Sequence, residues 1–307
     1  MTALIIVAGP TASGKSALAL RLAEAQRGVI INADSMQLYR DLPILTARPT
    51  PDDEARAPHR LYGVLDAADP ASAGRWLELA AAAIGEARAE QRPAIVVGGT
   101  GLYLYVLLHG IAPVPDIPLA IRNAARARLA ELGPPAFHAE LAGLDPVMAA
   151  RLRSTDRQRL LRAYEVVVGT GRSLAAWQET PPVRISLPAR RLGLALVPPR
   201  NVLYERIERR LREMIERGAL EELRALQRRA LAADLPLMKA VAVPELLAQV
   251  SGHVDLDTAL ELAVIQTRRY AKRQLTWLRH QLPELRPVAE FGDDVDPRRA
   301  MALAGAC

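Results

Sequence analysis

The chain has 307 residues, of which 50% are hydrophobic, and a formal net charge of +6. This much apolar material can bury a large core, so we expect one elaborated domain or two smaller ones rather than a disordered chain. No run of about 18 apolar residues is present and no basic leader precedes the first apolar segment, which argues against export and membrane insertion. The single cysteine, Cys307, cannot form an internal disulfide, as expected in a reducing cytoplasm.

The positive charge favours an anionic partner, and it is distributed unevenly between lysine and arginine. Of the 40 basic residues only three are lysine, namely Lys15, Lys239 and Lys272. In a chain so biased toward arginine, a retained lysine indicates a position where a compact ammonium group is needed. For Lys239 and Lys272, a bias in codon composition explains the pattern equally well.

Strand-like runs at residues 4–8, 29–33, 94–97 and 192–197 alternate with helical patterns. This alternation predicts an α/β fold with a P-loop NTPase-like parallel sheet and helices on both faces. Prolines bracket residues 114–190, which have no strand pattern and contain more arginine than acidic residues, so we expect a helical insertion there. The predicted domains are a discontinuous catalytic core of residues 1–113 and 191–290, the insertion of residues 114–190, and a peripheral tail of residues 291–307.

Residues 9–16 read Gly-Pro-Thr-Ala-Ser-Gly-Lys-Ser, directly after the first strand-like run and before a helical stretch. The Walker pattern for a phosphate loop requires this context. The backbone N–H groups of such a loop point at phosphate oxygens, Lys15 adds a positive charge, and the Ser16 hydroxyl is placed to bind Mg²⁺. A glycine turn with an incidental lysine is the alternative. The residues expected to bind a diphosphate are Gly9, Pro10, Thr11, Ala12, Ser13, Gly14, Lys15 and Ser16.

Asp34 follows the second strand-like run, in the sequence Asn-Ala-Asp-Ser-Met-Gln of residues 32–37. This position is the carboxyl edge of the sheet, beside the phosphate loop, where open α/β sheets bind ligands. A carboxylate there can ligate Mg²⁺ or act as a general base. The alternative is an aspartate that caps the next helix.

The third strand-like run ends in the sequence Gly-Gly-Thr-Gly of residues 98–101, with no acidic residue. A nucleoside triphosphatase carries its Walker B carboxylate in this region. Its absence favours an enzyme that uses the phosphate loop to hold a diphosphate that leaves intact. The glycines permit close backbone approach and Thr100 offers a hydroxyl, although a simple strand-to-helix turn explains the glycines alone.

Two later helical segments carry many cations. The first segment, residues 205–216, contains Arg210, which can reach the phosphates. It also contains four glutamates, so an ion-paired, solvated helix face is an equal alternative. The second, residues 268–279, has five positive charges and no acid, interleaved with Tyr270 and Trp277. This pattern is typical of contacts to a nucleic-acid backbone, and the aromatic residues are alternatively part of a core.

Several blocks occur together, in one order, along nearly the whole chain. They are the phosphate loop, Asp34-Ser35-Met36-Gln37, Val-Gly-Gly-Thr-Gly-Leu-Tyr at 97–103, Asp-Arg-Gln-Arg at 156–159 with Arg162, residues 206–210, and residues 269–277. In this combination the chain resembles the tRNA dimethylallyltransferase family, also called tRNA isopentenyltransferases. The set is far more specific than the phosphate loop alone.

The resemblance implies transfer of a five-carbon dimethylallyl group from dimethylallyl diphosphate to N6 of adenosine 37 in the tRNA anticodon loop, with release of pyrophosphate. It implies that Asp34 accepts the N6 proton and that Thr100 contacts the base. It also implies that Lys15, Ser16 and Arg210 hold the departing diphosphate together with Mg²⁺. Preorganised cations and a nearby carboxylate suit this reaction, because an allylic diphosphate ionises readily once neutralised and adenine N6 is a poor nucleophile.

The resemblance further implies a set of tRNA-binding positions. They are Asp34, Ser35, Met36, Gln37, Thr100, Arg122, Gln158, Arg159, Leu160, Leu161, Arg162, Lys239, Lys272, Arg273, Gln274 and Arg279. A helical insertion rich in arginine suits contact with the anticodon-loop backbone while a base unstacks. The chain departs from the family where a Gly-Tyr pair is usual, because residues 239–245 read Lys-Ala-Val-Ala-Val-Pro-Glu.

Three other functions fit part of the pattern. An adenylate-type prenyltransferase acting on the free nucleotide would share the phosphate loop, Asp34 and the arginines, but it needs no extended cationic surface. A small-molecule or nucleotide kinase would share the loop and consume ATP. A non-enzymatic RNA-binding module leaves the loop unexplained. We therefore expect a cytoplasmic, monomeric enzyme that uses Mg²⁺, takes tRNA and dimethylallyl diphosphate as partners, and does not bind membranes.

Overall fold

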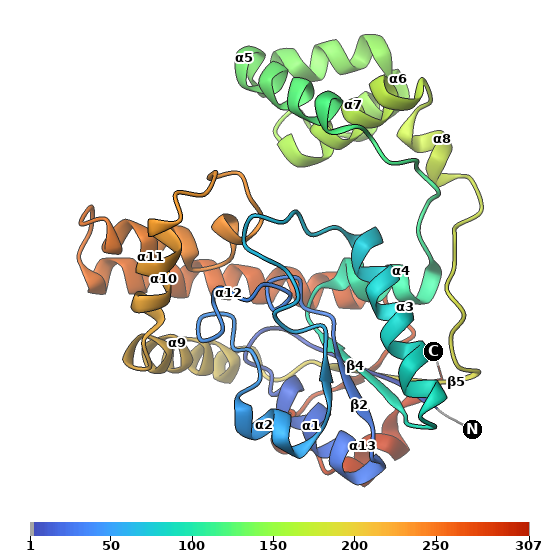
Figure 1. Cartoon of the computed structure of the whole chain (residues 1–307), viewed down its shortest axis with the longest axis vertical. Coiled ribbons are helices and arrows are strands. Elements are labelled where there is room, and N and C mark those ends of the chain that lie inside the picture. The colour runs from blue at the N-terminus through green and yellow to red at the C-terminus, as the bar shows by residue number, and fades with distance from the viewer. Residues whose placement is uncertain (1–2, 307) are drawn as a thin grey trace. The chain divides into compact units, whose positions relative to one another are not determined.

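A computed structural model describes residues 3–306 of the chain (Figure 1). Two compact units are present. One comprises the chain up to Leu108 together with the chain from Ile185 onward, and the other is His109–Arg184. The borders lie a few residues before those expected from the proline-rich segments. A single insertion therefore interrupts the first unit, which contains the phosphate loop.

The first unit is built on a sheet in the order β3-β2-β4-β1-β5-β6. Its strands are β1 (Ala3–Ala8), β2 (Val29–Asn32), β3 (His59–Arg60), β4 (Ala94–Gly98), β5 (Arg190–Leu196), β6 (Arg286–Val288) and β7 (Gly305–Ala306). All neighbours along this order pair in parallel, and β7 pairs antiparallel with β5. The predicted parallel α/β sheet is confirmed. The sequence pattern did not predict β3, β6 and β7, because two or three residues are too few to show a strand pattern.

Both faces of the central strands are covered. Ile5 and Val7 pack in a cluster with Leu18 and Leu22 of α1 (Lys15–Gln26), while the alternate residues Leu4 and Ile6 are also fully buried. Successive residues of a strand point to opposite faces, so a strand buried at every position needs a layer on each side. Helix α3 (Ala73–Ala89) supplies part of the second layer, where the Trp76 indole donates to the Asn32 carbonyl at 2.8 Å.

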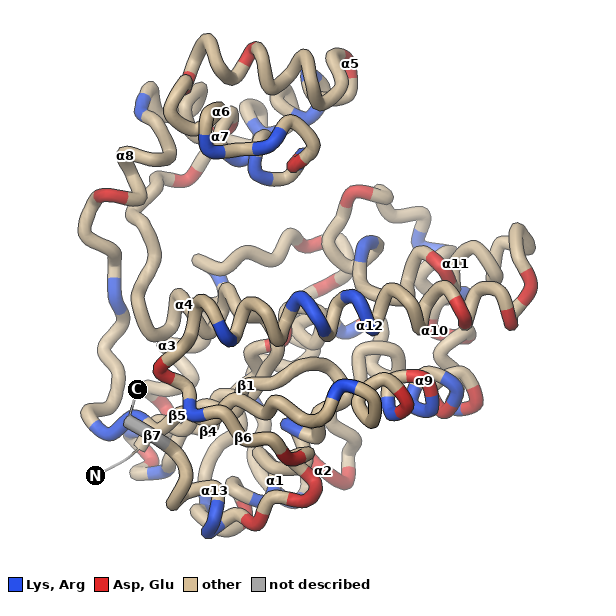
Figure 2. The backbone as a smooth tube through the Cα atoms, turned by 180° about the vertical axis from the view of Figure 1, so that it is seen from behind, with Lys and Arg blue, Asp and Glu red and all other residues tan. Residues whose placement is uncertain are grey.

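The first unit contains seven further α-helices and one short 3₁₀ helix among its described residues. They are α2 (Pro51–Arg56), α4 (Gly101–His109), α9 (Arg200–Glu216), α10 (Ala219–Arg228), the short 3₁₀ helix η1 (Leu237–Lys239), α11 (Val243–Val250), α12 (Leu256–Gln281) and α13 (Pro297–Leu303). The buried residues of α12 recur every three or four positions, as in an amphipathic helix. Figure 2 shows lysine and arginine gathered in the C-terminal half of α12, whereas α9 carries both signs of charge. Among the described residues, none of the helices combines the length and apolar content needed to cross a membrane.

The second unit is helical, as expected for the insertion. It contains α5 (Leu119–Leu144), α6 (Pro146–Arg151), α7 (Arg157–Thr170) and α8 (Leu174–Gln178). Its small core includes Leu129, Phe137, Leu141 and Leu160. Helix α5 is kinked at Gly133, where φ is 71°, and two prolines follow. Glycine adopts this left-handed conformation without the steric cost that a Cβ atom imposes.

The segment after residue 291 is not the peripheral tail that the sequence suggested. Val295 and Ala300 are fully buried and belong to the same core cluster as α1. The Gly292 N–H donates to the Ser13 carbonyl at 2.8 Å, and Arg206 forms an ion pair with Asp293. The reason is β6, which extends the sheet beyond β5 and brings the following residues back against the phosphate loop.

Candidate active site

The phosphate loop connects β1 to α1 and forms a compact backbone turn. The Ser13 N–H donates to the Pro10 carbonyl at 3.3 Å, and Gly14 precedes α1 with φ of 79°. A side chain at Gly14 would collide with the backbone of Gly292 and Asp293, so glycine is required there on steric grounds. The Lys15 side chain is buried, and its ammonium donates to the Pro10 carbonyl at 3.4 Å. The first turn of α1 therefore starts at the loop with its N–H groups available to an anion.

Asp34 lies at the end of β2, on the same side of the sheet as the loop. Its Oδ1 accepts from the Met36 N–H at 3.1 Å, and its own N–H donates to the Asn32 side chain at 2.7 Å. Residues 35–38 form a turn and not a helix, so the alternative of an ordinary helix cap does not apply. The second carboxylate oxygen has no hydrogen bond in the structure as described.

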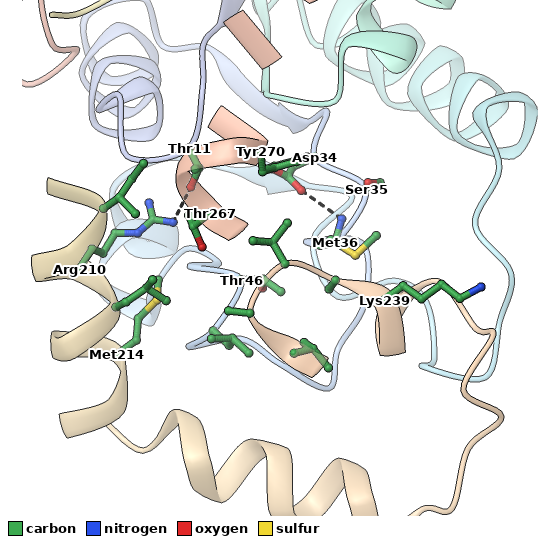
Figure 3. A pocket seen from close by; sticks show the side chains of 17 residues that line it. Thr11, Asp34, Ser35, Met36, Thr46, Arg210, Met214, Lys239, Thr267 and Tyr270 are labelled. Atoms are coloured by element: carbon green, nitrogen blue, oxygen red, sulfur yellow. Dashed lines mark hydrogen bonds between the residues drawn. The ribbon is translucent and has the colours of Figure 1, made fainter. Parts of the chain in front are cut away.

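Asp34 and Arg210 line one cavity of about 210 Å³ (Figure 3). The polar part of its lining also includes Thr11, whose hydroxyl accepts from Arg210 at 2.8 Å. The apolar part is formed mainly by α9 and by the segment that begins α11. The apolar lining residues are Met36, Leu45, Ile207, Leu211, Met214, Ala240, Val241, Ala242 and Val243. One small chamber thus has a cationic end beside the phosphate loop and an apolar wall.

Burial perturbs Arg210, which lines this cavity, and the nearby Lys15 of the phosphate loop. Desolvation lowers the pKa of Lys15 from 10.5 to about 8; the negative charge of Asp34 opposes this shift and the positive charge of Arg210 adds to it. Burial also lowers the pKa of Arg210, while Asp34 again opposes the change. The buried Lys15 and the partly buried Arg210 near one carboxylate leave excess positive charge, which an anionic group can neutralise.

Thr100 lies next to Ser35 and not in the lining of the cavity. Its hydroxyl accepts from the Ser35 N–H at 2.9 Å and donates to the Ser35 Oγ at 3.2 Å. A further hydrogen bond links the Thr100 and Tyr270 side chains. The structure therefore brings Thr100 to the Asp34 edge of the site through Ser35.

The start of α1, with the Ser16 hydroxyl, fits a divalent cation that is also coordinated by a bound diphosphate. Ser16 is exposed at the start of α1 and lines a second cavity of about 480 Å³ together with Asp293. Among residues 3–306, no group of three or more His, Cys, Asp or Glu side chains could hold a metal by itself. Mg²⁺ commonly binds through one or two protein oxygens, water and substrate phosphates, so the Ser16 hydroxyl is a suitable ligand.

The cationic residues of α12 lie outside the cavity. Lys272, Arg273 and Arg279 are exposed, and a surface groove of about 710 Å³ is lined by six side chains and Gln281. The six are Arg269, Lys272, Arg273, Thr276, Trp277 and His280. Lys239 lines the cavity, but its ammonium extends away from the other labelled side chains (Figure 3).

Three of the expected tRNA-binding side chains are in the interior. Gln37 is buried and its amide donates to the carbonyls of Thr46 and Ala47, at 2.8 and 2.9 Å. Leu160 is fully buried in the core of the second unit. Gln274 is also buried, between two loops. These side chains do not form an RNA-binding surface in this structure, because each of them is buried by packing within its own unit.

The other expected tRNA-binding residues of the second unit lie along α7 and the start of α5. Gln158 and Arg159 are exposed, and Arg159 lies 3.4 Å from Asp156. Leu161 packs against the core. Arg162 is half-buried and lies 3.9 Å from Glu165, and burial lowers its pKa in spite of that carboxylate. Arg122 lies 3.9 Å from the exposed Asp116.

Sequence reasoning missed the contribution of α12 to the cavity. Thr267 and Tyr270 line it, and burial strongly raises the pKa of the Tyr270 hydroxyl. Thr267, Tyr270 and Gln274 are three or four residues apart and so share one face of the helix. That spacing is visible in the sequence, but the sequence does not show which partner the face meets.

Residues 239–245, which lack the Gly-Tyr pair usual in the family, include a residue with a strained backbone conformation. Ala242 precedes α11 with φ of 71°, a left-handed conformation that favours glycine, while Pro244 occupies the first turn of α11. Proline is accepted there because the first N–H groups of a helix have no helical partner. Pro244 is therefore compatible with the helix start.

Replacing Ala242 with glycine should stabilise the protein by about 1 kcal/mol, because relief of the left-handed strain exceeds the added entropy of the unfolded chain. Chemical unfolding of both proteins, with the control Ala248→Gly inside α11, measures the difference. The control should be destabilised. A less stable Ala242→Gly protein would show that Ala242 is not strained.

Comparisons with known proteins show which family this chain is similar to. A family model described as IPP transferase matches residues 37–281, and one described as isopentenyl transferase matches residues 2–69. A Rhodospirillum rubrum protein named tRNA dimethylallyltransferase is 55% identical over 94% of this chain and 88% of its own length. A Caulobacter protein of the same name is 48% identical over 96% and 97%.

Solved structures show the same likeness. A tRNA isopentenylpyrophosphate transferase from Bacillus halodurans is 31% identical, with a TM-score of 0.68 over 98% of this chain and 93% of that one. A eukaryotic dimethylallyltransferase described as acting on tRNA is 25% identical, with a TM-score of 0.77 over 96% of this chain and 75% of that one. Both sequence and structure match over almost the full length, and this chain belongs to the IPP transferase family.

Proposed function

We propose that this protein transfers a dimethylallyl group from dimethylallyl diphosphate to N6 of adenosine 37 in the anticodon loop of tRNA, releasing pyrophosphate. The observation that carries the proposal is the cavity in which Asp34 and Arg210 lie across from an apolar wall, beside the phosphate loop. The names of the relatives, which are prenyltransferases of tRNA, support the substrate classes.

The polar end of the cavity suits the leaving group. As the bond between the allylic carbon and the diphosphate oxygen breaks, the electron pair goes to the diphosphate. Lys15 and Arg210 stabilise the developing negative charge from positions fixed by the fold. Mg²⁺, held by the Ser16 hydroxyl and the diphosphate, would add positive charge there. The apolar residues of α9 take the five-carbon chain and exclude water from the allylic cation.

Asp34 serves as the proton acceptor. When N6 of adenine bonds to the allylic carbon, the nitrogen becomes acidic and a neighbouring carboxylate can take its proton. One Asp34 oxygen is held by the Met36 N–H, which orients the carboxyl group. Ser35, Met36 and Tyr270 line the cavity near Asp34, and Thr100 lies behind Ser35. These residues form the proposed contact surface for the base.

The extended substrate is recognised by cations outside the cavity. The groove on α12 and the exposed arginines of α7 offer positive charge and aromatic surface, which suit RNA backbone and unstacked bases. The proposed contacts outside the cavity are Arg122, Gln158, Arg159, Leu161, Arg162, Lys272, Arg273 and Arg279. Lys239, which lines the cavity, is a further proposed contact.

Mass spectrometry of nucleosides from tRNA tests the proposal. Incubation with the protein, Mg²⁺ and dimethylallyl diphosphate should add one C5H8 unit to adenosine, and only in tRNAs with adenosine at position 37. AMP offered in place of tRNA should gain nothing. Prenylation of AMP alone would instead identify a free-nucleotide enzyme, and consumption of ATP without prenyl transfer would identify a kinase.

Affinity for tRNA should fall steeply with salt, because cations that neutralise phosphates release counterions. Replacing Lys272 or Arg159 with alanine should reduce the slope of log K against log salt by about 0.7–0.9 for each phosphate that the variant no longer neutralises. Arg298→Ala on α13 changes the net charge equally and is a matched control, since Arg298 is exposed and outside the groove. Equal slopes for Lys272→Ala and Arg298→Ala would exclude the α12 groove as a phosphate-binding surface.

A further inference from the structure

Gln274 makes one hydrogen bond to each of two loops, which follow the paired strands β1 and β4. Its Oε1 accepts from the Thr11 N–H of the phosphate loop at 2.9 Å. Its Nε2 donates to the Gly99 carbonyl, in the loop after β4, also at 2.9 Å. The side chain is only 5% exposed, so both ends of its amide are committed to the protein.

The loop after β4 is shaped to admit this side chain. A Cβ atom on Gly99 would lie 2.2 Å from the Gln274 amide nitrogen, and one on Gly101 would lie 1.9 Å from the Trp277 ring. Both glycines therefore make room for α12. The sequence suggested that these glycines permit close backbone approach, and the structure shows that the neighbours are side chains of α12.

The bridge links the two halves of the proposed reaction site. On one side, the Thr11 hydroxyl accepts from Arg210 at 2.8 Å, so Gln274 and Arg210 hold the same residue of the phosphate loop. On the other side, Gly99 precedes Thr100, whose hydroxyl accepts from the N–H of Ser35, next to Asp34. One side chain thus joins the segment that holds the diphosphate to the segment that presents the carboxylate.

We propose that Gln274 is a positioning residue that sets the distance between the phosphate loop and the Asp34–Thr100 edge, rather than a tRNA ligand. The catalytic consequence rests on the proposed function, because group transfer between two substrates depends on the spacing of their sites. The side chain touches no substrate and acts through Thr11 and Gly99.

Gln274→Met tests the proposal, since methionine has a similar length but neither hydrogen bond. In hydrogen–deuterium exchange, the Thr11 amide should lose protection. Affinity for Mg²⁺-pyrophosphate, measured by calorimetry, should fall about 10-fold, and kcat should fall roughly 10- to 100-fold, as expected for small misplacements of reacting groups. The affinity for tRNA should stay within about twofold of wild type, because the variant keeps every cation that can bind a phosphate.

A control variant and a conservative variant separate positioning from general destabilisation. Gln266→Met makes the same change on the same helix, at a partly exposed position outside the cavity lining, and should leave all four measurements unchanged. Gln274→Glu keeps an acceptor for the Thr11 N–H but cannot donate to Gly99 when ionised. It should therefore retain Thr11 protection and still lose kcat.

The outcomes are distinct. Unchanged Thr11 protection in Gln274→Met overturns the proposal, as does a loss of tRNA affinity with normal pyrophosphate affinity. If the wild-type protein transfers nothing to tRNA, the proposed function fails. The exchange and pyrophosphate measurements then still decide whether Gln274 positions the phosphate loop.

Discussion

Asp34→Asn should lower kcat by roughly 10²- to 10⁴-fold, the usual contribution of a general base. Asparagine has nearly the same shape and its carbonyl can still accept from the Met36 N–H, so the turn after β2 should form normally. It cannot accept a proton from N6. The melting temperature should be unchanged, and the affinities for tRNA and dimethylallyl diphosphate should be close to those of wild type.

Single-turnover kinetics with saturating substrates isolate the chemical step, in which the prenyl group is transferred and N6 loses its proton. Asp257→Asn, at an exposed position in the first turn of α12, is the matched control and should show normal turnover. A normal rate for Asp34→Asn would mean that the proton leaves by another route. Weaker diphosphate binding with a normal chemical step would instead assign Asp34 to the bound metal ion.

Lys15→Met should lower kcat/KM by about 100-fold or more, because it removes a preorganised charge from the leaving diphosphate. The wild-type protein should also show a distinctive pH dependence. Burial places the pKa of Lys15 at about 8, so the free protein loses this charge as pH rises through about 8. Affinity for pyrophosphate should decline over the same range, and Lys15→Met should lack that decline.

The affinity for pyrophosphate should fall as pH rises, whereas the stability of the folded protein should increase. The pKa of Lys15 is about 8 in the folded state and 10.5 in its ordinary state, so between these values the unfolded chain binds more protons. The free energy of unfolding contributed by this residue therefore rises as pH increases from about 8 to 10.5. Chemical unfolding across that range should show the rise in wild type and not in Lys15→Met. Parallel curves would show that Lys15 titrates normally.

The sequence by itself was enough to predict three central strands, the phosphate loop and the position of Asp34, because each depends on residues that are close together in the chain. Continuous apolar runs of three to six residues identify β1, β2 and β4, because buried parallel strands must be apolar on both faces. The phosphate loop is recognisable because its function resides in consecutive backbone N–H groups and an adjacent lysine. Asp34 follows from the same logic, since the end of β2 reaches the same edge of the sheet as the end of β1.

Tertiary structure alone decided which distant segments complete the site. Gln274 lies 263 positions after Thr11 in the chain, and Asp293 is paired with Arg206 although several helices intervene. No periodicity encodes such pairs, because a helix pattern shows which face is buried but not what covers it. The family resemblance placed Gln37, Leu160 and Gln274 among the tRNA-binding positions, but it did not show that each of them becomes buried once its own segment packs.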